Sequence, residues 1–261
     1  MSRCLILAAG EGKRLRPLTE KYPKALVTLL DRPLLHWQLD VLKAAGIKNV
    51  GLVTGYKAEQ LSGLGYPTFL NSRFGSTNMV ESLFSAITFF ENKTEDIIIS
   101  YGDIIYQRDN LSSVLNTKGD LVVMVDLGWF DLWSLRNQNP LDDAETLKIN
   151  RAGKIVEIGK KPHSLDDIQG QYTGLIKVSC KKIREFIAFY KSLDRNAEYD
   201  NRTFQKMHLT TFLQLLINAG WSIIPAPVTH GWLEVDTTED LNLYEKLHTT
   251  GQLSSLWNAD E

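Results

Sequence analysis

The segment Leu5–Leu26 reads LILAAGEGKRLRPLTEKYPKAL and decides the fold. Its first five residues, Leu5–Ala9, form an apolar run that is typical of a buried strand. The run opens into Gly10-Glu11-Gly12, whose backbone amides can face a phosphate because glycine has no Cβ to block the approach. Three cations follow directly, namely Lys13, Arg14 and Arg16, and Lys24 follows Pro23. A strand, a glycine loop and clustered cations together indicate a site for a polyphosphate.

Two familiar glycine motifs do not fit this segment. The dinucleotide fingerprint G-x-G-x-x-G requires glycine at position 15, where the chain has Leu15. A Walker A loop requires Ser or Thr after its lysine, but Lys13 is followed by Arg14. The glycine spacing alone is equally compatible with an ordinary strand-to-helix turn that carries solvated basic residues. Residues outside this segment are therefore needed to distinguish a polyphosphate site from an ordinary turn.

Composition limits the class of protein. The chain has 261 residues, of which 43% are apolar, so it is long and apolar enough to bury a full core. Its net charge of −2 argues against nucleic acid as a partner, because a surface that follows phosphates needs an excess of basic residues. The only two cysteines, Cys4 and Cys180, exclude a thiolate metal cage and suggest a reducing compartment.

The sequence predicts neither export nor membrane insertion. A strand begins by residue 3, which leaves no room for a signal peptide before it. No apolar run approaches the roughly 18 residues of a membrane span. We therefore expect a cytoplasmic protein with no membrane partner.

The first half of the chain alternates strands with helices. We expect strands at Leu5–Ala9, Asn49–Thr54, Thr68–Asn71, Ile97–Ile99 and Leu121–Val125, and helices at Leu34–Ala45 and Met79–Phe90. This alternation is typical of a doubly wound α/β fold, in which a mostly parallel, Rossmann-like sheet binds its ligand at the carboxyl ends of the strands.

The pattern changes after about residue 128. We expect a hairpin formed by Thr146–Asn150 and Lys154–Ile158, strands at Gln171–Ser179, Trp221–Pro225 and Trp232–Val235, and helices at Lys181–Leu193, Leu209–Ala219 and Thr237–His248. Residues 129–180 are interpreted as a small β-rich elaboration on the sheet, so residues 1–261 form one domain. The polar stretch Asp194–Lys206 is predicted to be a mobile loop or a partner contact.

Two acidic residues stand at the ends of predicted strands. Asp103 follows the strand that contains Ile97–Ile99, and Asp236 precedes the last helix. A single aspartate in such a place is more often a turn former or a helix cap. The pair changes that expectation, since two carboxylates brought together repel each other unless a cation lies between them. Mg²⁺ is the cation that suits carboxylates combined with substrate phosphates.

Three short motifs between Leu7 and Leu26 resemble the signature of a known family. Leu7–Leu15, Pro17-Leu18-Thr19 and Pro23–Leu26 resemble the L-A-A-G-x-G-x-R-L, P-L-T and P-K-A-L signature of the sugar-phosphate nucleotidyltransferase superfamily. Members of that superfamily transfer a nucleoside monophosphate from an NTP to a phosphorylated acceptor and release pyrophosphate. The resemblance implies catalytic roles for Arg14 and Lys24 and metal-ligand roles for Asp103 and Asp236. It also implies that the nucleotide is bound by Leu7, Ala8, Ala9, Gly10, Glu11, Gly12 and Lys13.

A second motif points to one branch of the superfamily. Residues 71–83, NSRFGSTNMVESL, resemble the N-x-x-[FY]-x-x-[TN]-N-x-x-S-L pattern of the phosphocholine cytidylyltransferase-like branch, which uses CTP. Asn78 and Ser82 would lie one helical turn apart and could contact the base, while Gly55 would contact it through the backbone. Asn78 is equally well interpreted as a helix N-cap. CTP, or another NTP, is therefore the expected nucleotide.

The acceptor side is less well defined. Lys161 and the run Tyr172, Thr173 and Gly174 resemble acceptor-binding positions of the superfamily, although Lys160 stands where an acidic residue is usual. Aromatic side chains near these segments could form a cage for a quaternary ammonium group or simply belong to the core: Trp129, Phe130, Trp133, Trp221 and Trp232. Asp131, Glu157 and Asp200 could instead bind an amino group.

These resemblances divide the chain into two functional halves. Residues 1–128 would mainly bind the nucleotide, and residues 129–261 would mainly bind the acceptor and supply the second metal-binding aspartate. A phosphocholine- or phosphoglutamine-like acceptor, as used in capsule or cell-surface polysaccharide biosynthesis, is expected. A sugar 1-phosphate acceptor and a non-catalytic nucleotide-binding regulatory module remain the alternatives. A homodimer is compatible with the sequence.

Overall fold

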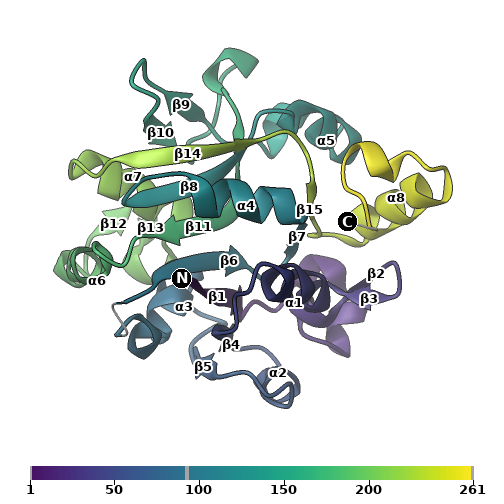
Figure 1. Ribbon diagram of the computed structural model, residues 1–261, viewed down its shortest axis with the longest axis horizontal. Helices are drawn as coiled ribbons and strands as arrows, with labels where there is room; N and C mark the ends of the chain where they lie inside the picture. Colours follow the sequence, from purple (N-terminus) through teal and green to yellow (C-terminus); the bar gives the residue numbers. More distant parts are fainter. Residues whose placement is uncertain (1, 92–93, 260–261) are drawn as a thin grey trace.

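The computed structural model describes residues 2–91 and 94–259. Its core is a nine-stranded sheet, built from β1 (Ser2–Ala8), β4 (Val50–Thr54), β5 (Thr68–Leu70), β6 (Asp96–Tyr101), β8 (Leu121–Asp126), β9 (Leu147–Ile149), β10 (Ile155–Ile158), β11 (Gln171–Val178) and β14 (Ile223–Val228). The strand order is β5-β4-β1-β6-β11-β8-β14-β10-β9 (Figure 1). All of these strands except β10 and β11 run in the same direction. The expected mostly parallel sheet is thus confirmed.

Helices cover both faces of the sheet. On one side lie α1 (Leu34–Ala44), α2 (Ala58–Ser62), α4 (Arg108–Asn116), α5 (Trp129–Arg136) and α8 (Thr238–Thr249). On the other side lie α3 (Met79–Ser85), α6 (Ile183–Ser192) and α7 (Leu209–Asn218). Cys4, Ile6 and Ala8 of β1 belong to the first core. Their neighbours Leu5 and Leu7 belong to the second, because successive side chains of a strand point to opposite faces. This is the doubly wound arrangement that the sequence predicts.

Most of the predicted helices and strands are present, but the hairpin and the strand between residues 146 and 179 occupy unexpected places in the sheet. The hairpin predicted before residue 160 is β9–β10, and β10 also pairs with β14, so the hairpin extends the sheet at its edge. In contrast, β11 lies at the centre of the sheet, antiparallel to both β6 and β8. Residues 129–180 therefore supply a central strand as well as an elaboration. The short helices α2, α4 and α5 were not predicted from the sequence.

Two segments differ in detail from expectation. The stretch Asp194–Lys206 contains a small hairpin of β12 (Glu198–Tyr199) and β13 (Arg202–Thr203). The helix predicted over Met79–Phe90 ends at Ser85 and continues as a 3₁₀ turn. The 3₁₀ turns of the chain are Lys13–Leu15, Leu18–Glu20, Lys24–Leu26, Ile87–Phe90, Pro140–Asp142, Leu165–Asp167, Phe204–Lys206 and Leu253–Ser255.

Short strand pairs outside the main sheet position the site. The pair of β2 (Thr28–Leu29) and β3 (Arg32–Pro33) precedes α1. More important is the antiparallel pair of β7 (Ile104–Tyr106) and β15 (Trp232–Glu234), in which Glu234 lies opposite Ile104. The pair is extended by a hydrogen bond from the Val235 amide to the Asp103 carbonyl at 3.0 Å. Two segments far apart in sequence thereby meet at the end of β6.

Among the described residues, every helix is too short or too polar to span a bilayer.

Candidate active site

Three charged side chains from distant parts of the chain meet at the carboxyl end of β6. The Lys24 Nζ donates to Asp103 Oδ2 at 2.7 Å and also contacts Asp236 Oδ1. Asp103 enters this position through Gly102, where an added Cβ would lie 2.7 Å from the Leu7 carbonyl oxygen. Glycine is needed there because β1 and the turn after β6 approach so closely. The sequence prediction that Asp103 and Asp236 lie together is consistent with this geometry.

The charges of Lys24, Asp103 and Asp236 shift the pKa values of Lys24 and Asp236. The Lys24 side chain is only 13% exposed, and burial alone would lower its pKa, but the Asp103 and Asp236 carboxylates outweigh burial and hold that pKa above its usual value. Burial likewise acts to raise the pKa of Asp236, yet the charge of Lys24 outweighs it and keeps this pKa below its usual range. Arg14 lies 3.1 Å from the other Asp236 oxygen and is largely exposed. These shifts favour the ionised forms of Lys24 and Asp236, and Arg14 lies at the more exposed side of the cluster.

A third carboxylate joins the two aspartates. Asp103, Glu234 and Asp236 each place one oxygen within 4.8 Å of the others. Burial and the charge of Asp236 raise the pKa of Glu234 to about 8. The Asp103 Oδ1 is buried and has no hydrogen-bond partner within the described part of the chain. An all-oxygen set with one unsatisfied carboxylate oxygen could hold a hard divalent cation. Glu234 was not among the residues predicted from the sequence, although its position two residues before Asp236 in an extended segment puts both on one face.

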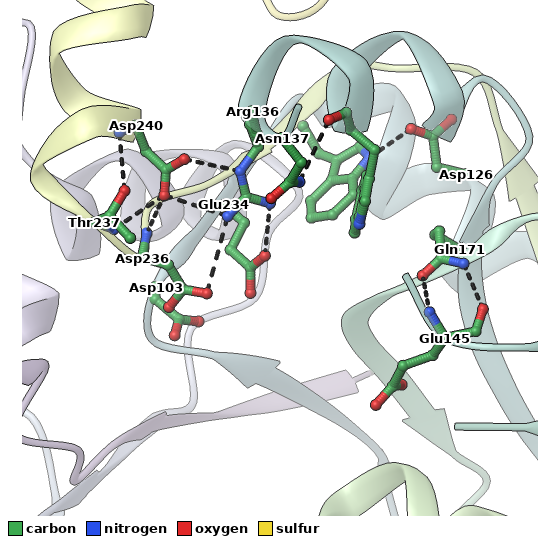
Figure 2. Close-up of polar contacts among 12 residues, drawn as sticks. Asp103, Asp126, Arg136, Asn137, Glu145, Gln171, Glu234, Asp236, Thr237 and Asp240 are labelled. Atoms are coloured by element: carbon green, nitrogen blue, oxygen red, sulfur yellow. Dashed lines mark hydrogen bonds and ion pairs between the residues drawn. The ribbon is translucent and has the colours of Figure 1, made fainter. Parts of the chain in front are cut away.

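Arg136 and Asp240 brace the segment that carries Glu234 and Asp236. The Arg136 side chain is 5% exposed, donates from Nη1 to Glu234 Oε2 at 2.9 Å, and binds both Asp240 oxygens at 2.9 and 3.2 Å. Asp240 Oδ2 in turn accepts from the Asp236 and Thr237 amides at 2.9 and 3.0 Å. Figure 2 shows Arg136 reaching from α5 to Asp240 on one side and to Glu234 on the other. Thr237 and Asp240 form a capping box at the start of α8, and Asp240 also fixes the backbone of Asp236.

A cavity of about 140 Å³, which we call the first cavity, opens on one side of the cluster. Its wall contains Leu7, Ala8, Ala9, Gly10, Lys24, Asn78, Met79, Ser82, Gly102 and Asp103. Gly10 has no atom of a neighbouring segment within 4 Å of where a Cβ would stand, so its backbone faces open space. Six predicted nucleotide-binding residues thus line one hollow. Glu11, Gly12, Lys13 and Gly55 are not part of this wall.

Residues of the second motif support the first cavity through a polar network. The Asn71 Nδ2 donates to Thr77 Oγ1 at 2.9 Å and to Ser82 Oγ at 3.0 Å. Asn78 caps α3, because its Oδ1 accepts from the Met79 amide at 2.8 Å, which confirms the N-cap interpretation. Gly55 has a packing role, since an added Cβ would lie 2.7 Å from the Ala9 carbonyl oxygen.

A larger hollow of about 280 Å³, the second cavity, opens on the other side of the cluster. Arg14, Glu234 and Asp236 line it together with the predicted acceptor residues Tyr172, Thr173 and Gly174. Trp133 and Trp232 are also in its wall, whereas Trp129 and Trp221 pack elsewhere and Phe130 is exposed. Met79 lines both cavities, so the two hollows adjoin.

Lys161 lies outside the second cavity. Its Nζ donates to the Leu141 and Asp142 carbonyl oxygens at 2.6 and 2.7 Å. It lines an outer cavity that also includes Lys160, Asp200 and Arg202. Two other predicted amino-group ligands already have side-chain partners, because Asp131 lies 3.2 Å from His230 and Glu157 lies 2.8 Å from Lys160. Lys161 therefore lies apart from the acid–lysine cluster.

Comparison with known proteins agrees with this geometry. Residues 4–158, more than half of the chain, match the family model described as the MobA-like NTP transferase domain. The chain is 41% identical over 248 residues to the CTP:phosphoglutamine cytidylyltransferase of Campylobacter jejuni, covering 92% of this chain and 97% of that protein. It is 40% identical over 86 residues to the choline-phosphate cytidylyltransferase of Streptococcus pneumoniae, covering 31% of this chain and 38% of that protein.

A solved structure is similar over nearly the whole chain. The CTP:phosphocholine cytidylyltransferase of Streptococcus pneumoniae superimposes with a TM-score of 0.66, covering 95% of this chain and 98% of that one at 20% identity. At that identity the likeness concerns the fold. Together with the family match and the long, closely similar relative, the acid–lysine cluster between two cavities leads to one conclusion: this chain belongs to the family of MobA-like NTP transferase domains and is a nucleotidyltransferase.

Proposed function

We propose that the enzyme transfers CMP from CTP to a small phosphorylated acceptor of the phosphoglutamine class and releases pyrophosphate. The observation that carries this proposal is the position of Lys24, Asp103 and Asp236 between two adjoining cavities. A reaction that joins two substrates needs its charged groups at their junction. The similarity to the Campylobacter jejuni enzyme over almost its whole length supports the choice of CTP and of this acceptor class.

The first cavity would hold the nucleotide. Its wall is the backbone at the end of β1, and the open approach to Gly10 leaves room for a phosphate against the main chain. Arg14, at the mouth of the second cavity, would neutralise charge on the phosphates of the leaving pyrophosphate. Lys24 would contact the α-phosphate and the acceptor phosphate together, because it stands where the two cavities meet. These roles for Arg14 and Lys24 are electrostatic and positional.

Mg²⁺ is the cofactor that we propose for this site. The fit is supported by three carboxylates within 4.8 Å of one another and by the unsatisfied Asp103 Oδ1. Asp103 and Asp236 would be its ligands, with Glu234 beside them. When bound, Mg²⁺ supplies positive charge that offsets the negative charge of the nucleotide phosphates. The acidic side chains and Lys24 keep that charge in a fixed place.

The reaction needs no general base. An acceptor phosphate is largely dianionic near neutral pH, so its oxygen attacks the α-phosphorus directly. The new bond joins that oxygen to the α-phosphorus, the bond from the α-phosphorus to the bridging oxygen breaks, and pyrophosphate leaves with the electron pair. The residues of the site therefore act by alignment and charge neutralisation, as in phosphoryl transfer generally.

The test is a matrix of nucleotides and acceptors. The enzyme is incubated with CTP, UTP, dTTP or GTP together with phosphoglutamine, phosphocholine or hexose 1-phosphates, and released pyrophosphate is measured. We expect the highest kcat/KM with CTP and phosphoglutamine. Release with hexose 1-phosphates alone would replace this proposal by sugar-nucleotide synthesis. Absence of release from every pair would favour a non-catalytic nucleotide-binding module.

A further inference from the structure

One acidic residue in the wall of the second cavity has no role in the reaction described above. Glu145 precedes β9, and its backbone is fixed by the side chain of Gln171. The Glu145 amide donates to Gln171 Oε1 at 3.2 Å, and Gln171 Nε2 donates to the Glu145 carbonyl oxygen at 2.6 Å. Gln171 is 3% exposed, so this double contact is itself anchored in the core. Figure 2 shows both hydrogen bonds.

The Glu145 carboxylate lies near the acidic residues Asp143 and Asp200, although cationic side chains also line the outer cavity. Within residues 2–91 and 94–259, no lysine, arginine or histidine forms an ion pair with it. The hydrogen bond from the Thr210 hydroxyl is long, at 3.4 Å. Burial raises the pKa of Glu145 to about 7, and the charges of Asp143 and Asp200 act in the same direction. A carboxylate held in this way is costly unless a cation joins it.

The position of Glu145 relates it to the reacting centre. It lines the same cavity as Arg14 and Asp236, and it also lines the outer cavity, so it lies where the two hollows join. Figure 2 shows Glu145 clearly separated from Asp103 and Asp236. A molecule whose phosphate lies at the acid–lysine cluster would thus extend away from it to reach Glu145. Trp133 and Trp232 supply apolar wall for the carbon chain of such a molecule.

We propose that the Glu145 carboxylate binds a positively charged nitrogen of the acceptor and thereby selects cationic acceptors over neutral ones. This inference rests on the proposed transfer to a phosphorylated acceptor. The acceptors named for two relatives, phosphoglutamine and phosphocholine, each carry such a nitrogen. Two of the other acids considered for this task are less suitable, since Asp131 already contacts His230 and Glu157 already forms an ion pair with Lys160. Glu145 is therefore a specificity-determining residue of the second cavity.

The decisive variant is Glu145→Gln. Glutamine retains an oxygen that can accept from Thr210 and removes only the charge. Its matched control is Glu157→Gln on β10, which removes an acidic charge outside the wall of either cavity and of the outer cavity. Each protein is assayed with phosphoglutamine, phosphocholine and phosphoethanolamine. The neutral counterpart of phosphoethanolamine is ethylene glycol monophosphate, in which a hydroxyl group replaces the ammonium group.

We expect Glu145→Gln to raise the KM of the cationic acceptors by about tenfold, which corresponds to about 1.4 kcal/mol of binding. The KM of CTP, and the kcat/KM measured with the neutral acceptor, should stay within about twofold of the wild-type values. Glu157→Gln should behave as wild type throughout. An equal loss of kcat/KM for cationic and neutral acceptors, or unchanged KM values in Glu145→Gln, would overturn the assignment.

A binding measurement separates failure of this inference from failure of the proposed reaction. The phosphorylated amines are titrated calorimetrically into wild-type and Glu145→Gln protein, with no turnover needed. Weaker binding to the variant supports the ammonium site even if no pyrophosphate is released in the assay above. Equal binding to both proteins contradicts it even if cytidylyl transfer is fully confirmed.

Discussion

The two cavities on either side of the acid–lysine cluster differ in whether backbone or side-chain atoms form most of their walls. The first is walled by the backbone at the end of β1 and by small or apolar side chains, with Lys24 and Asp103 as its charged groups. The second is walled by side chains, many of them charged or aromatic: Arg14, Trp133, Asp143, Glu145, Tyr172, Trp232, Glu234 and Asp236. A backbone wall suits a group common to many substrates, such as a polyphosphate. A side-chain wall can change its specificity through a single substitution. Four predictions test this contrast.

The largest effect should come from the cluster that both cavities share. Asp103→Ala and Asp236→Ala should each lower turnover by about 10³-fold with every acceptor, because each removes charge from the reacting centre itself. Pyrophosphate release at saturating substrates measures the loss. Thermal unfolding of the same preparations should show a retained cooperative transition. Full activity of either variant would mean that the shared cluster is not the reacting centre.

The next largest effect should come from the brace behind the second cavity. Arg136→Met should lower the free energy of unfolding by about 3 kcal/mol, because Asp240 and Glu234 lose their buried cation. Urea titration measures this change. The kcat should also fall while the KM of CTP stays near the wild-type value, since Asp236 loses its fixed position. A destabilised variant with unchanged kcat would reduce Arg136 to a structural role.

The backbone wall of the first cavity should be sensitive to an added side chain at Gly10, where we expect it to contact the nucleotide. Gly10→Ala should raise the KM of CTP by about tenfold, because the added methyl group enters the first cavity and no protein atom from a neighbouring segment opposes it. Its melting temperature should remain unchanged. Gly75→Ala is the matched control, since its Cβ also meets open space but lies outside that cavity. Equal behaviour of the two variants would argue against phosphate binding at Gly10.

The smallest effect concerns stability on the side-chain wall. The pKa of Glu145 is about 7 in the folded protein against an ordinary 4.5, so between these values the folded state holds a proton that the unfolded state has lost. Stability therefore falls as the pH rises through this window. Glu145→Gln should melt about 2–4 °C above wild type at pH 8.5. The difference should shrink towards zero near pH 4.5.

This comparison has a built-in control. The neighbouring Asp143, Asp200 and His208 are present in both proteins, so the difference in melting temperature reports the removal of the Glu145 carboxylate. Differential scanning calorimetry across the pH range provides the measurement. A difference that is independent of pH would show that Glu145 does not carry a buried charge.

Local patterns account for what the sequence could predict. Asp103 follows a strand of the main sheet and Lys24 belongs to a compact motif, so their place at the carboxyl ends of the parallel strands follows from a general rule. Asp236 follows β15, which pairs with β7 outside the main sheet, so that rule does not place it. The doubly wound fold follows equally from the alternation of strands with helices. The roles of Lys24 and both aspartates remain predictions, now with a geometry that is compatible with them.

The missed residues depend on partners that are far away in sequence. Arg136 binds Asp240, 104 residues later, and Glu145 meets Thr210, 65 residues later. Nothing in their neighbouring residues distinguishes them from solvated charges. The central place of β11 is a similar case, because strand order depends on packing across the whole sheet. Lys161 shows the converse, since a local motif suggested a role while its amino group donates to two carbonyl oxygens.

The pairing of β7 with β15 has a consequence for how the acidic cluster is completed. Every strand of the main sheet precedes residue 229, whereas Glu234 and Asp236 come after it. The main sheet and the wall of the first cavity are therefore built without the segment that supplies Glu234 and Asp236. The acidic cluster is complete only when the three-residue strand β15 pairs with β7, so the two short strands link the carboxyl-terminal part of the chain to the end of β6.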